Sequence, residues 1–193
     1  MQRNIVKAES APGVEERMPM DGKDAVLELS CFNRYRFAGQ FTEGKIVVDA
    51  ACADGYGIDY LNAKEYIGLD YSKEALDKAK KNHGKQGVFK KANLETREIP
   101  DCDVLVTFET LEHLEDPLGF LKRASKHAKE KIVLSVPNNE TPGDNQFHKW
   151  IFNENDFKDI VSGIFPNTEF YQQDDKTIGN NIYPMWIVAV INL

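Results

Sequence analysis

The sequence predicts an α/β fold: one three-layer domain built on a seven-stranded, mostly parallel sheet. Short apolar runs rich in β-branched residues alternate with helical patterns, which is typical of parallel strands buried on both faces. The last two strand patterns are joined directly by a polar turn at 179–181, so we expect an antiparallel pair in which the last strand is reversed. The 193 residues suffice for one domain with a full core but not for two.

Composition limits the partners and the location. The 41% hydrophobic content is that of a globular protein, and a net charge of −7 makes nucleic acid a less favoured partner. Three widely spaced cysteines form no disulfide pattern and indicate a reducing compartment. No signal peptide is visible and no apolar run reaches the roughly 20 residues of a membrane span, so we expect a cytoplasmic protein without membrane contact. One group of lysines is expected to be solvated surface: Lys78, Lys80, Lys81, Lys85, Lys90 and Lys91.

Residues 1–44 are expected to form an N-terminal arm and a leading helix. The first part mixes charges with prolines and a glycine, which predicts an extended arm. A helical pattern begins at Asp24 and continues to Phe41. This helix either packs against the sheet edge or covers a cofactor as a lid, because it ends directly before a glycine-containing turn.

Residues 45–193 supply the alternating elements of the globular unit. Ser72 and Asn153 mark helix starts because their side chains cap the first turn, and Pro117 suits the first helical position. The helices expected from these signals cover 73–81, 118–129 and 153–160. The strands expected from the apolar runs cover 46–48, 66–69, 88–94, 103–108, 132–136, 169–173 and 185–191.

The stretch from Lys45 to Asp70 organises the rest of the domain. Its first strand ends at Asp49 and gives way to small residues and glycines, followed by a helical pattern that carries Ile58 and Leu61 on one side. A second strand then ends at another acid, Asp70. Strand, glycine turn, helix, strand and acid form the first half of a nucleotide-binding α/β fold.

The residues of this turn favour a cationic cofactor. A dinucleotide site uses G-x-G-x-x-G, and the turn has alanine at the first two of these glycine positions. Asp49 and Asp54 would lie beside the pyrophosphate, where like charges about 4 Å apart cost around 4 kcal/mol at an effective dielectric constant of about 20. S-adenosylmethionine (SAM), with its ammonium and sulfonium groups, avoids this cost. An NAD-dependent dehydrogenase is an alternative interpretation, and it requires that the pyrophosphate of NAD can lie beside Asp49.

Several segments match one family. GKIVVDAACADGYG is close to the motif of an apolar strand followed by D-x-G-C-G-x-G, and the chain resembles the class I SAM-dependent methyltransferases of the type 11 and type 12 branch, which have a Rossmann-like fold. The other matching segments are ERMP (16–19), NRYRFA (33–38), YIGLDYS (66–72), KKANLE (90–95), TFETLEHLEDP (107–117), and SVPNN followed by QFH (135–148).

The resemblance implies roles in cofactor binding. Asp70 accepts hydrogen bonds from the ribose hydroxyls, and Asp49 orients the loop or meets the ammonium group through water. Ala51 and Ala53 replace glycines, and alanine suits these positions only if φ is negative. Arg34 and Tyr35 either close over the methionine carboxylate or simply pack. The full set of expected cofactor contacts is Tyr35, Asp49, Ala51, Gly55, Asp70, Tyr71, Asn93, Leu94 and Phe108, in which Asn93 stands where the family usually has an acid.

The E-T-L-E-H segment and a distant histidine form the candidate catalytic group. Glu109, His113 and His148 are the expected catalytic residues, with a histidine as general base for an acceptor hydroxyl. Together with Glu112 they resemble the ligand set of small-RNA 3′-end ribose methyltransferases, which would hold Mg²⁺, Mn²⁺ or a similar ion. A third interpretation is that these residues only fix their loop through hydrogen bonds.

The expected activity is transfer of a methyl group from SAM to oxygen of a small molecule or glycan, with S-adenosylhomocysteine (SAH) as product. Two alternatives stay open. One is a SAM-binding interaction protein without catalysis, which the two alanines favour. The other is a metal-assisted RNA ribose methyltransferase.

Overall fold

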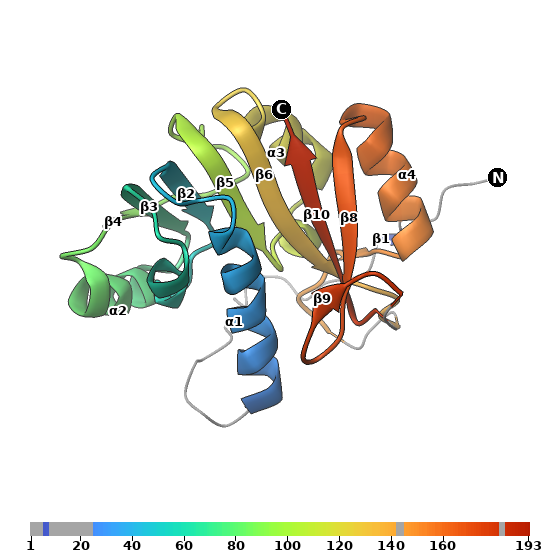
Figure 1. Cartoon of the computed structure of the whole chain (residues 1–193), viewed down its shortest axis with the longest axis horizontal. Coiled ribbons are helices and arrows are strands. Elements are labelled where there is room, and N and C mark those ends of the chain that lie inside the picture. The colour runs from blue at the N-terminus through green and yellow to red at the C-terminus, as the bar shows by residue number, and fades with distance from the viewer. Residues whose placement is uncertain (1–5, 8–24, 142–144, 182–183) are drawn as a thin grey trace.

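The computed structural model describes residues 6–7, 25–141, 145–181 and 184–193, so the ERMP segment lies outside the described residues. A large sheet forms its centre (Figure 1). Its strands are β2 (Ile46–Ala50), β3 (Glu65–Asp70), β4 (Val88–Lys91), β5 (Cys102–Phe108), β6 (Ala128–Pro137), β8 (Thr168–Gln173), β9 (Ile178–Gly179) and β10 (Trp186–Asn192). The α-helices are α1 (Ala25–Gly39), α2 (Lys73–His83), α3 (Pro117–Ala124) and α4 (Glu154–Ile164), and two 3₁₀ helices are η1 (Tyr56–Tyr60) and η2 (Leu111–His113).

The strand order is β4-β3-β2-β5-β6-β10-β8-β9. Strands β2 to β6 pair in parallel, whereas β10 is antiparallel to both β6 and β8. This confirms the mostly parallel Rossmann-like sheet with a reversed last strand. The expected number of seven strands was wrong by one, because the two-residue strand β9 adds an eighth at the edge. A separate pair joins β1 (Val6–Lys7) to β7 (Trp150–Ile151), two strands too short for a sequence pattern to predict.

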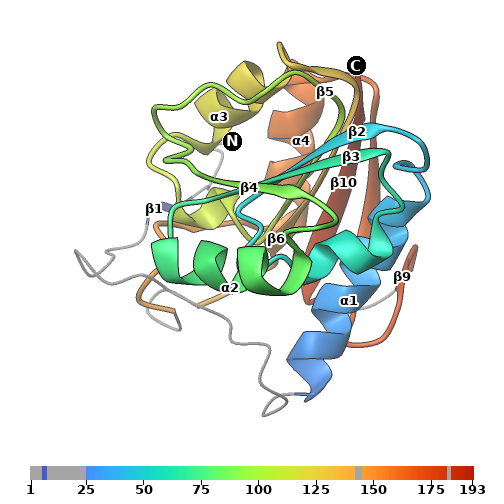
Figure 2. The ribbon, with the colours of Figure 1, turned by 90° about the vertical axis from the view of Figure 1, so that its left-hand side faces the viewer.

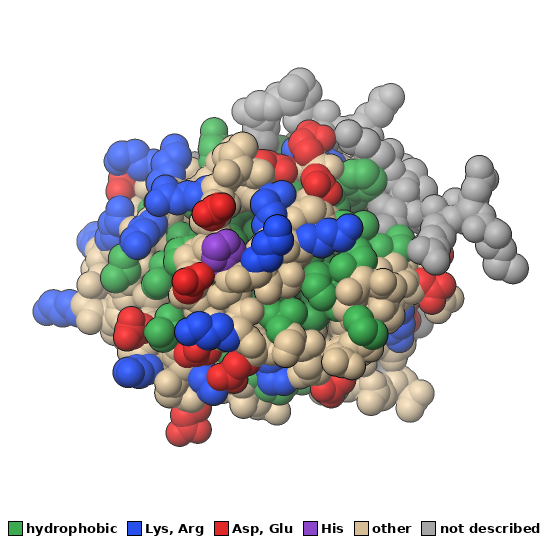
Figure 3. Space-filling view, turned by 90° about the horizontal axis from the view of Figure 1, so that it is seen from above, with side chains coloured by type: hydrophobic (Ala, Val, Ile, Leu, Met, Phe, Trp, Pro, Cys, Tyr) green, Lys and Arg blue, Asp and Glu red, His purple; other side chains and the backbone are tan. Residues whose placement is uncertain are grey.

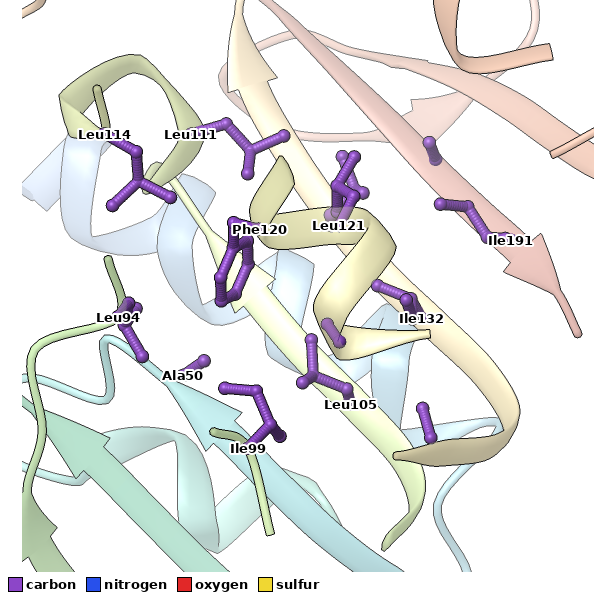
Figure 4. Packing of buried hydrophobic residues seen from close by; sticks show 14 of the residues in the cluster. Ala50, Leu94, Ile99, Leu105, Leu111, Leu114, Phe120, Leu121, Ile132 and Ile191 are labelled. Atoms are coloured by element: carbon purple, nitrogen blue, oxygen red, sulfur yellow. The ribbon is translucent and has the colours of Figure 1, made fainter. Parts of the chain in front are cut away.

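Helices cover both faces of the sheet, giving three layers (Figure 2). On one face, α3 contributes Phe120 and Leu121 to a core that includes Leu105 and Ile132 of the sheet (Figure 4). Phe157 of α4 belongs to the same core. On the other face α1 and α2 pack on a second core, whose members include Tyr35, Val47, Leu76 and Val104. The apolar runs are therefore buried on both sides, as parallel strands require.

The helix starts follow the predicted caps. The Ser72 side chain accepts a hydrogen bond from the Ala75 N–H (3.2 Å), and Asn153 accepts one from Asp156 (3.0 Å). The predicted end of the 118–129 helix was wrong: α3 ends at Ala124, and β6 already begins at Ala128. The spacing of apolar residues over 118–129 fits a helix, but the backbone from Ala128 pairs with β5 instead.

The helix expected after the glycine turn is also absent from the described residues, where the single short 3₁₀ helix η1 takes its place. Helix α1 packs on η1 and supplies the helical layer at this point. The leading helix therefore has a structural role in the core, whatever it does toward a ligand.

The surface agrees with the charge analysis. All six lysines of the group from Lys78 to Lys91 are exposed. On the face in Figure 3, Lys and Arg side chains are mixed with carboxylates, as on an ordinary solvated surface. Within the described part of the chain, no helix combines the length and apolar character needed to cross a membrane.

Candidate active site

The carboxyl ends of β2, β3, β5 and β6 meet at one edge of the sheet, which is where ligands bind in open α/β folds. At the end of β3, both oxygens of Asp70 accept backbone hydrogen bonds. The Ala53 N–H donates to Oδ2 (2.9 Å) and the Ser72 N–H donates to Oδ1 (2.7 Å). These bonds fix the carboxylate against the turn after β2. Each oxygen can accept more than one hydrogen bond, so the group suits a pair of ribose hydroxyls.

Asp49, at the end of β2, lies in a different environment. It is completely buried, and its carboxyl group accepts hydrogen bonds from the hydroxyls of Tyr66 (2.6 Å) and Tyr35 (3.1 and 3.2 Å). Burial raises the pKa of Asp49 to about 7, and the tyrosine hydroxyls offset part of this shift. Of the two roles expected for Asp49, this position favours orientation of the turn, because the side chain joins α1, β2 and β3.

The turn itself keeps a backbone shape that favours glycine. Ala51 (φ 68°), Ala53 (φ 49°) and Gly55 (φ 84°) all have positive φ. For alanine this left-handed conformation costs roughly 1–2 kcal/mol per residue. The condition of negative φ that would make the alanines harmless is therefore not met, and the surrounding structure holds them in a strained conformation.

The residues expected around an adenine lie beyond β3 and β4. Tyr71 is 54% exposed, and the Lys91 ammonium lies 4.9 Å from the centre of its ring. The Asn93 Oδ1 accepts the Glu95 N–H (2.9 Å), so this side chain shapes its own turn, and Leu94 is buried beside it. An exposed aromatic face next to Asp70 can stack on a base, as aromatic side chains do with planar ligands.

Helix α1 reaches this edge with two buried residues. The Tyr35 ring packs edge to face on Phe108 at the end of β5 (5.0 Å between centroids). Arg34 is 1% exposed and donates to Gln173 Oε1 (3.0 Å) while it lies over the Trp186 ring. Arg34 therefore links α1 to β8 and β10, and Tyr35 links α1 to β2 through its hydrogen bonds to Asp49.

Glu109 follows β5 with an unusual backbone, φ 48°. Its N–H donates to the backbone oxygen and the Oγ of Ser135 in β6, and the Ser135 hydroxyl donates to Glu109 Oε1 (2.6 Å). Strained non-glycine residues persist where the surroundings enforce them and are concentrated at active sites. The carboxylate of Glu109 is thus positioned by the neighbouring strand at the ligand-binding edge.

Three of the four expected metal ligands come together. Glu112, His113 and His148 each offer one ligand atom, and these atoms lie within 4.8 Å of one another. Glu112 is completely buried, and neither of its oxygens has a hydrogen-bond partner among the described residues. Burial, and after it the negative charge of Glu109, raises the pKa of Glu112 well above its usual value. Glu109 itself lies outside this group of three.

The two histidines are oriented by their Nδ1 atoms. His113 Nδ1 lies 3.1 Å from the backbone oxygen of Phe147, which can only accept, so this nitrogen carries a proton. His148 Nδ1 lies 2.5 Å from Glu140 Oε2, and its Nε2 lies 3.0 Å from the Asn145 amide. The two rings contact edge to face at 4.8 Å. In a neutral His113 the Nε2 atom is therefore the nitrogen that can accept a proton or bind a metal.

Sequence reasoning missed Tyr66 and Glu140, which hold Asp49 and His148. Tyr66 lies in a strand whose pattern explains it fully as core, and Glu140 lies in a polar loop without any motif. Both contacts depend on how distant segments pack, so no local signal could have identified them.

A model of a family described as methyltransferase domain matches residues 26–172. A probable S-adenosylmethionine-dependent methyltransferase of Mycobacterium tuberculosis is 29% identical over 127 residues, which is 60% of this chain and 46% of that protein. The chain thus spans about half the length of this curated relative.

Solved structures share the fold. The small RNA methyltransferase HEN1 superposes with a TM-score of 0.71 at 21% identity, covering 93% of this chain and 27% of that one. The magnesium protoporphyrin IX methyltransferase of Synechocystis, solved with bound SAH, gives a TM-score of 0.64 at 14% identity over 93% of this chain and 90% of that one.

Proposed function

Since this chain belongs to the methyltransferase domain family, we propose that it transfers a methyl group from SAM to an oxygen of a small molecule or glycan. The observation that supports this most is the meeting of two polar groups at one sheet edge. Asp70 with the turn after β2 suits a ribose, and Glu109 with His113 and His148 suits a hydroxyl that must lose a proton.

The described residues fit SAM at the ends of β2 and β3. Asp70 is held in place to accept ribose hydroxyls, Tyr71 and Leu94 can border the adenine, and Phe108 borders the reacting centre. The turn with Ala51 and Gly55 lies between these groups. It carries no positively charged side chain, which suits the ammonium and sulfonium groups.

Bound SAM supplies a methyl group on a positively charged sulfur, which needs no further activation. The remaining tasks fall to the chain: it must align the acceptor oxygen with the methyl group and accept its proton. Alignment alone can lower a barrier by about 7–11 kcal/mol. His113 Nε2 is our candidate for the proton acceptor. The buried Glu112 carboxyl group lies in the same group as His113 and could stabilise the imidazolium ion that forms, and the His148 ring contacts the His113 ring edge to face.

A metal-assisted reaction on an RNA ribose is the second candidate, and one observation favours it. Glu112 is a buried carboxyl group without a partner among the described residues, beside two imidazoles that lie within reach of one ion. A divalent ion held by Glu112, His113 and His148 would neutralise that group and could bind the acceptor oxygens. The overall charge of −7 argues against RNA but not against the ion.

Calorimetry with SAM and SAH, followed by a SAM-consumption screen over glycan, quinone-like and RNA acceptors, tests the proposal. We expect binding of both compounds and turnover with a hydroxyl-bearing acceptor. Failure to bind either compound would contradict the proposal. Binding without turnover of any acceptor would support the interaction protein instead.

Titration with Mn²⁺ separates the two enzyme candidates. Mn²⁺ binding that is lost in Glu112→Gln, together with turnover of RNA only when Mn²⁺ is present, would support the ribose methyltransferase. Turnover of a small acceptor in the presence of a chelator would exclude a need for the ion.

A further inference from the structure

Arg34 is a buried cation without an acidic hydrogen-bond partner among the described residues. Its Nη1 donates to Gln173 Oε1 (3.0 Å) and its Nη2 donates to Cys31 Sγ (3.2 Å), and both of these acceptors are neutral. Its Nε is buried and has no hydrogen-bond partner within the described ranges. Because a buried charge is costly unless it is paired and hydrogen-bonded, the unpaired Nε–H points to an anionic ligand.

The guanidinium lies too far along the sheet edge to serve the cofactor. Gln173 ends β8, and Trp186, whose ring centre lies 5.0 Å from the guanidinium carbon, begins β10. At the usual spacing of about 4.8 Å between neighbouring strands, the four steps from β3, which carries Asp70, to β10 span about 19 Å. The methionine part of SAM is a short chain of single bonds from the ribose. An anion that reaches Arg34 therefore belongs to the acceptor.

A second polar atom without a partner lies next to Trp186. Asn138 follows β6 directly, and the last residue of that strand, Pro137, pairs with Trp186. The Asn138 Nδ2 donates to the Pro184 backbone oxygen (3.0 Å), whereas its buried Oδ1 accepts no hydrogen bond from the described part of the chain. An unpaired amide oxygen fits a donor such as a hydroxyl. The two unpaired atoms together therefore fit a ligand that has both an anionic group and a hydroxyl.

The surface around this position gives a way in. Helix α1 and strand β9 both project beyond this edge of the sheet (Figure 1). They are joined by Asn33 Nδ2, which donates to the Lys176 backbone oxygen (2.7 Å) in an exposed position, and such a bond contributes little to stability. Met185, whose backbone oxygen accepts the Asn138 N–H (3.0 Å), is 49% exposed. An acceptor can therefore enter beside Met185 and reach Arg34 when α1 and the turn at 174–181 separate.

The charges nearby favour a carboxylate as the anionic group. Burial lowers the pKa of Arg34, but the negative charge of Glu109 raises it, so the guanidinium stays charged. Glu109 is thus near enough to repel an anion that binds there, and it repels a doubly charged phosphate more than a singly charged carboxylate. An arginine also matches the planar geometry of a carboxylate.

We propose that Arg34 and Asn138 bind the acceptor and that the acceptor is a sugar acid. Arg34 binds its carboxylate, and Asn138 binds one of its hydroxyls. This inference rests on the proposed function and specifies the substrate class of the same site. A sugar acid carries both groups on one small ring, and a further hydroxyl of that ring is left to face the candidate catalytic group around His113.

Three sugars with the same ring test this proposal. D-Glucuronate has the carboxylate, D-glucose lacks it, and D-glucose 6-phosphate has a phosphate attached at the same position. Saturation-transfer NMR on the SAH-loaded protein measures each Kd. We expect glucuronate to bind about 10- to 100-fold more tightly than glucose, the range for a charged hydrogen bond. Glucose 6-phosphate should bind more weakly than glucuronate.

Two substitutions separate the two contacts. In Arg34→Met the preference for glucuronate over glucose should fall to within about twofold, whereas in Asn138→Ala both sugars should bind about 3- to 10-fold more weakly with an unchanged preference. The Kd values for SAM and SAH should stay as in the wild type. Arg36→Met is the matched control, because Arg36 lies on the exposed side of α1, where it contacts Asn33 and the Tyr60 ring. It should leave every Kd unchanged.

The outcomes that would overturn the proposal are distinct. Equal affinities for glucuronate and glucose, no binding of any of the three sugars, tighter binding of glucose 6-phosphate, or an unchanged preference in Arg34→Met would each do so. Weaker SAM binding in Arg34→Met with an unchanged sugar preference would assign Arg34 to the cofactor instead. If Arg34→Met unfolds, Arg34→Lys is measured, and its preference should fall several-fold because lysine lacks the planar fork.

The failure of the proposed function gives a different result. A wild-type protein that binds neither SAM nor SAH in calorimetry would overturn the proposed function. The three sugars are then titrated into the ligand-free protein, where a retained preference for glucuronate that is lost in Arg34→Met would still support the sugar-acid site.

Discussion

The completely buried acids at two ends of the same sheet edge, Asp49 and Glu112, are in opposite situations. At the ends of β2 and β3, which we call the cofactor end, Asp49 and Asp70 are held by tyrosine hydroxyls and backbone N–H groups. At the ends of β5 and β6, which we call the acceptor end, both oxygens of Glu112 lack a partner among the described residues. Satisfied acids stabilise a fixed geometry, whereas an unsatisfied one stores a cost that a proton, an ion or a substrate can relieve. Asp49 and Asp70 are thus held before a ligand binds, whereas Glu112 is left for a ligand to satisfy.

The largest expected effect lies at the acceptor end. His113→Asn keeps a donor for the Phe147 oxygen but removes the second ring nitrogen. We expect kcat to fall about 10²- to 10⁴-fold, the usual contribution of a general base, with an unchanged Kd for SAM. Kinetics with the acceptor found in the screen, together with calorimetry, measure both quantities. His127→Asn, whose histidine contacts Asp101 outside the group of candidate catalytic residues, is the control. A kcat within twofold of the wild type would assign His113 a purely structural role.

The next prediction concerns how Asp49 makes the free energy of unfolding depend on pH. Asp49 has a pKa of about 7 in the folded protein and 3.8 as its ordinary value, so between these pH values the folded state binds its proton more tightly than the unfolded chain does. The free energy of unfolding should therefore fall as pH rises from 4 to 7, by up to about 4 kcal/mol from this group. In Asp49→Asn this decline should largely disappear in denaturant titrations at several pH values. The same slope in both proteins would show that Asp49 does not carry it.

The difference between the two ends also explains what the sequence could predict. The parallel strands were predicted well, because runs such as Ile46–Val48 and Val104–Val106 must be buried on both faces. The cofactor was predicted from the acids of one short turn, and the prediction agrees with the match to a methyltransferase domain family and with a relative named a probable S-adenosylmethionine-dependent methyltransferase. Local sequence was sufficient there because the groups involved are near neighbours in the chain or lie at strand ends.

Long-range packing determined the rest. Tyr35 reaches Asp49 only because α1 packs on η1, where sequence periodicity had predicted a full helix. Glu140 reaches His148 within a loop that has no pattern of its own, and Asp54 differs from Asp49 only through burial and bonding. Contacts of this kind depend on the assembled tertiary structure, so residue types and spacing alone could not predict them.

A smaller effect tests the packing that closes the cofactor end. A Cβ atom on Gly57 would lie 2.2 Å from the Tyr35 ring, so Gly57→Ala must displace Tyr35 or η1. We expect the free energy of unfolding to fall by about 1–3 kcal/mol, as in other overpacked cores. Gly163→Ala is the control, because nothing lies within 4 Å of that position in α4 and alanine favours a helix by roughly 0.5–1 kcal/mol. Chemical denaturation of both variants measures the contrast, and equal stabilities would show that Tyr35 packs loosely.

The smallest effect concerns the strain of the turn. Ala53 has φ 49°, so Ala53→Gly should relieve the left-handed conformation while it adds freedom to the unfolded chain. The net result should be a gain of up to about 1 kcal/mol in the free energy of unfolding. Ala63→Gly, at a loop position without positive φ, should instead lose roughly 0.4–1 kcal/mol. If both substitutions destabilise the protein equally, the turn is not strained. If Ala53→Gly stabilises the protein and also tightens SAM binding in calorimetry, the alanine side chain crowds the ligand as well. The turn would then lower the affinity for SAM although Asp49 and Asp70 are held in place.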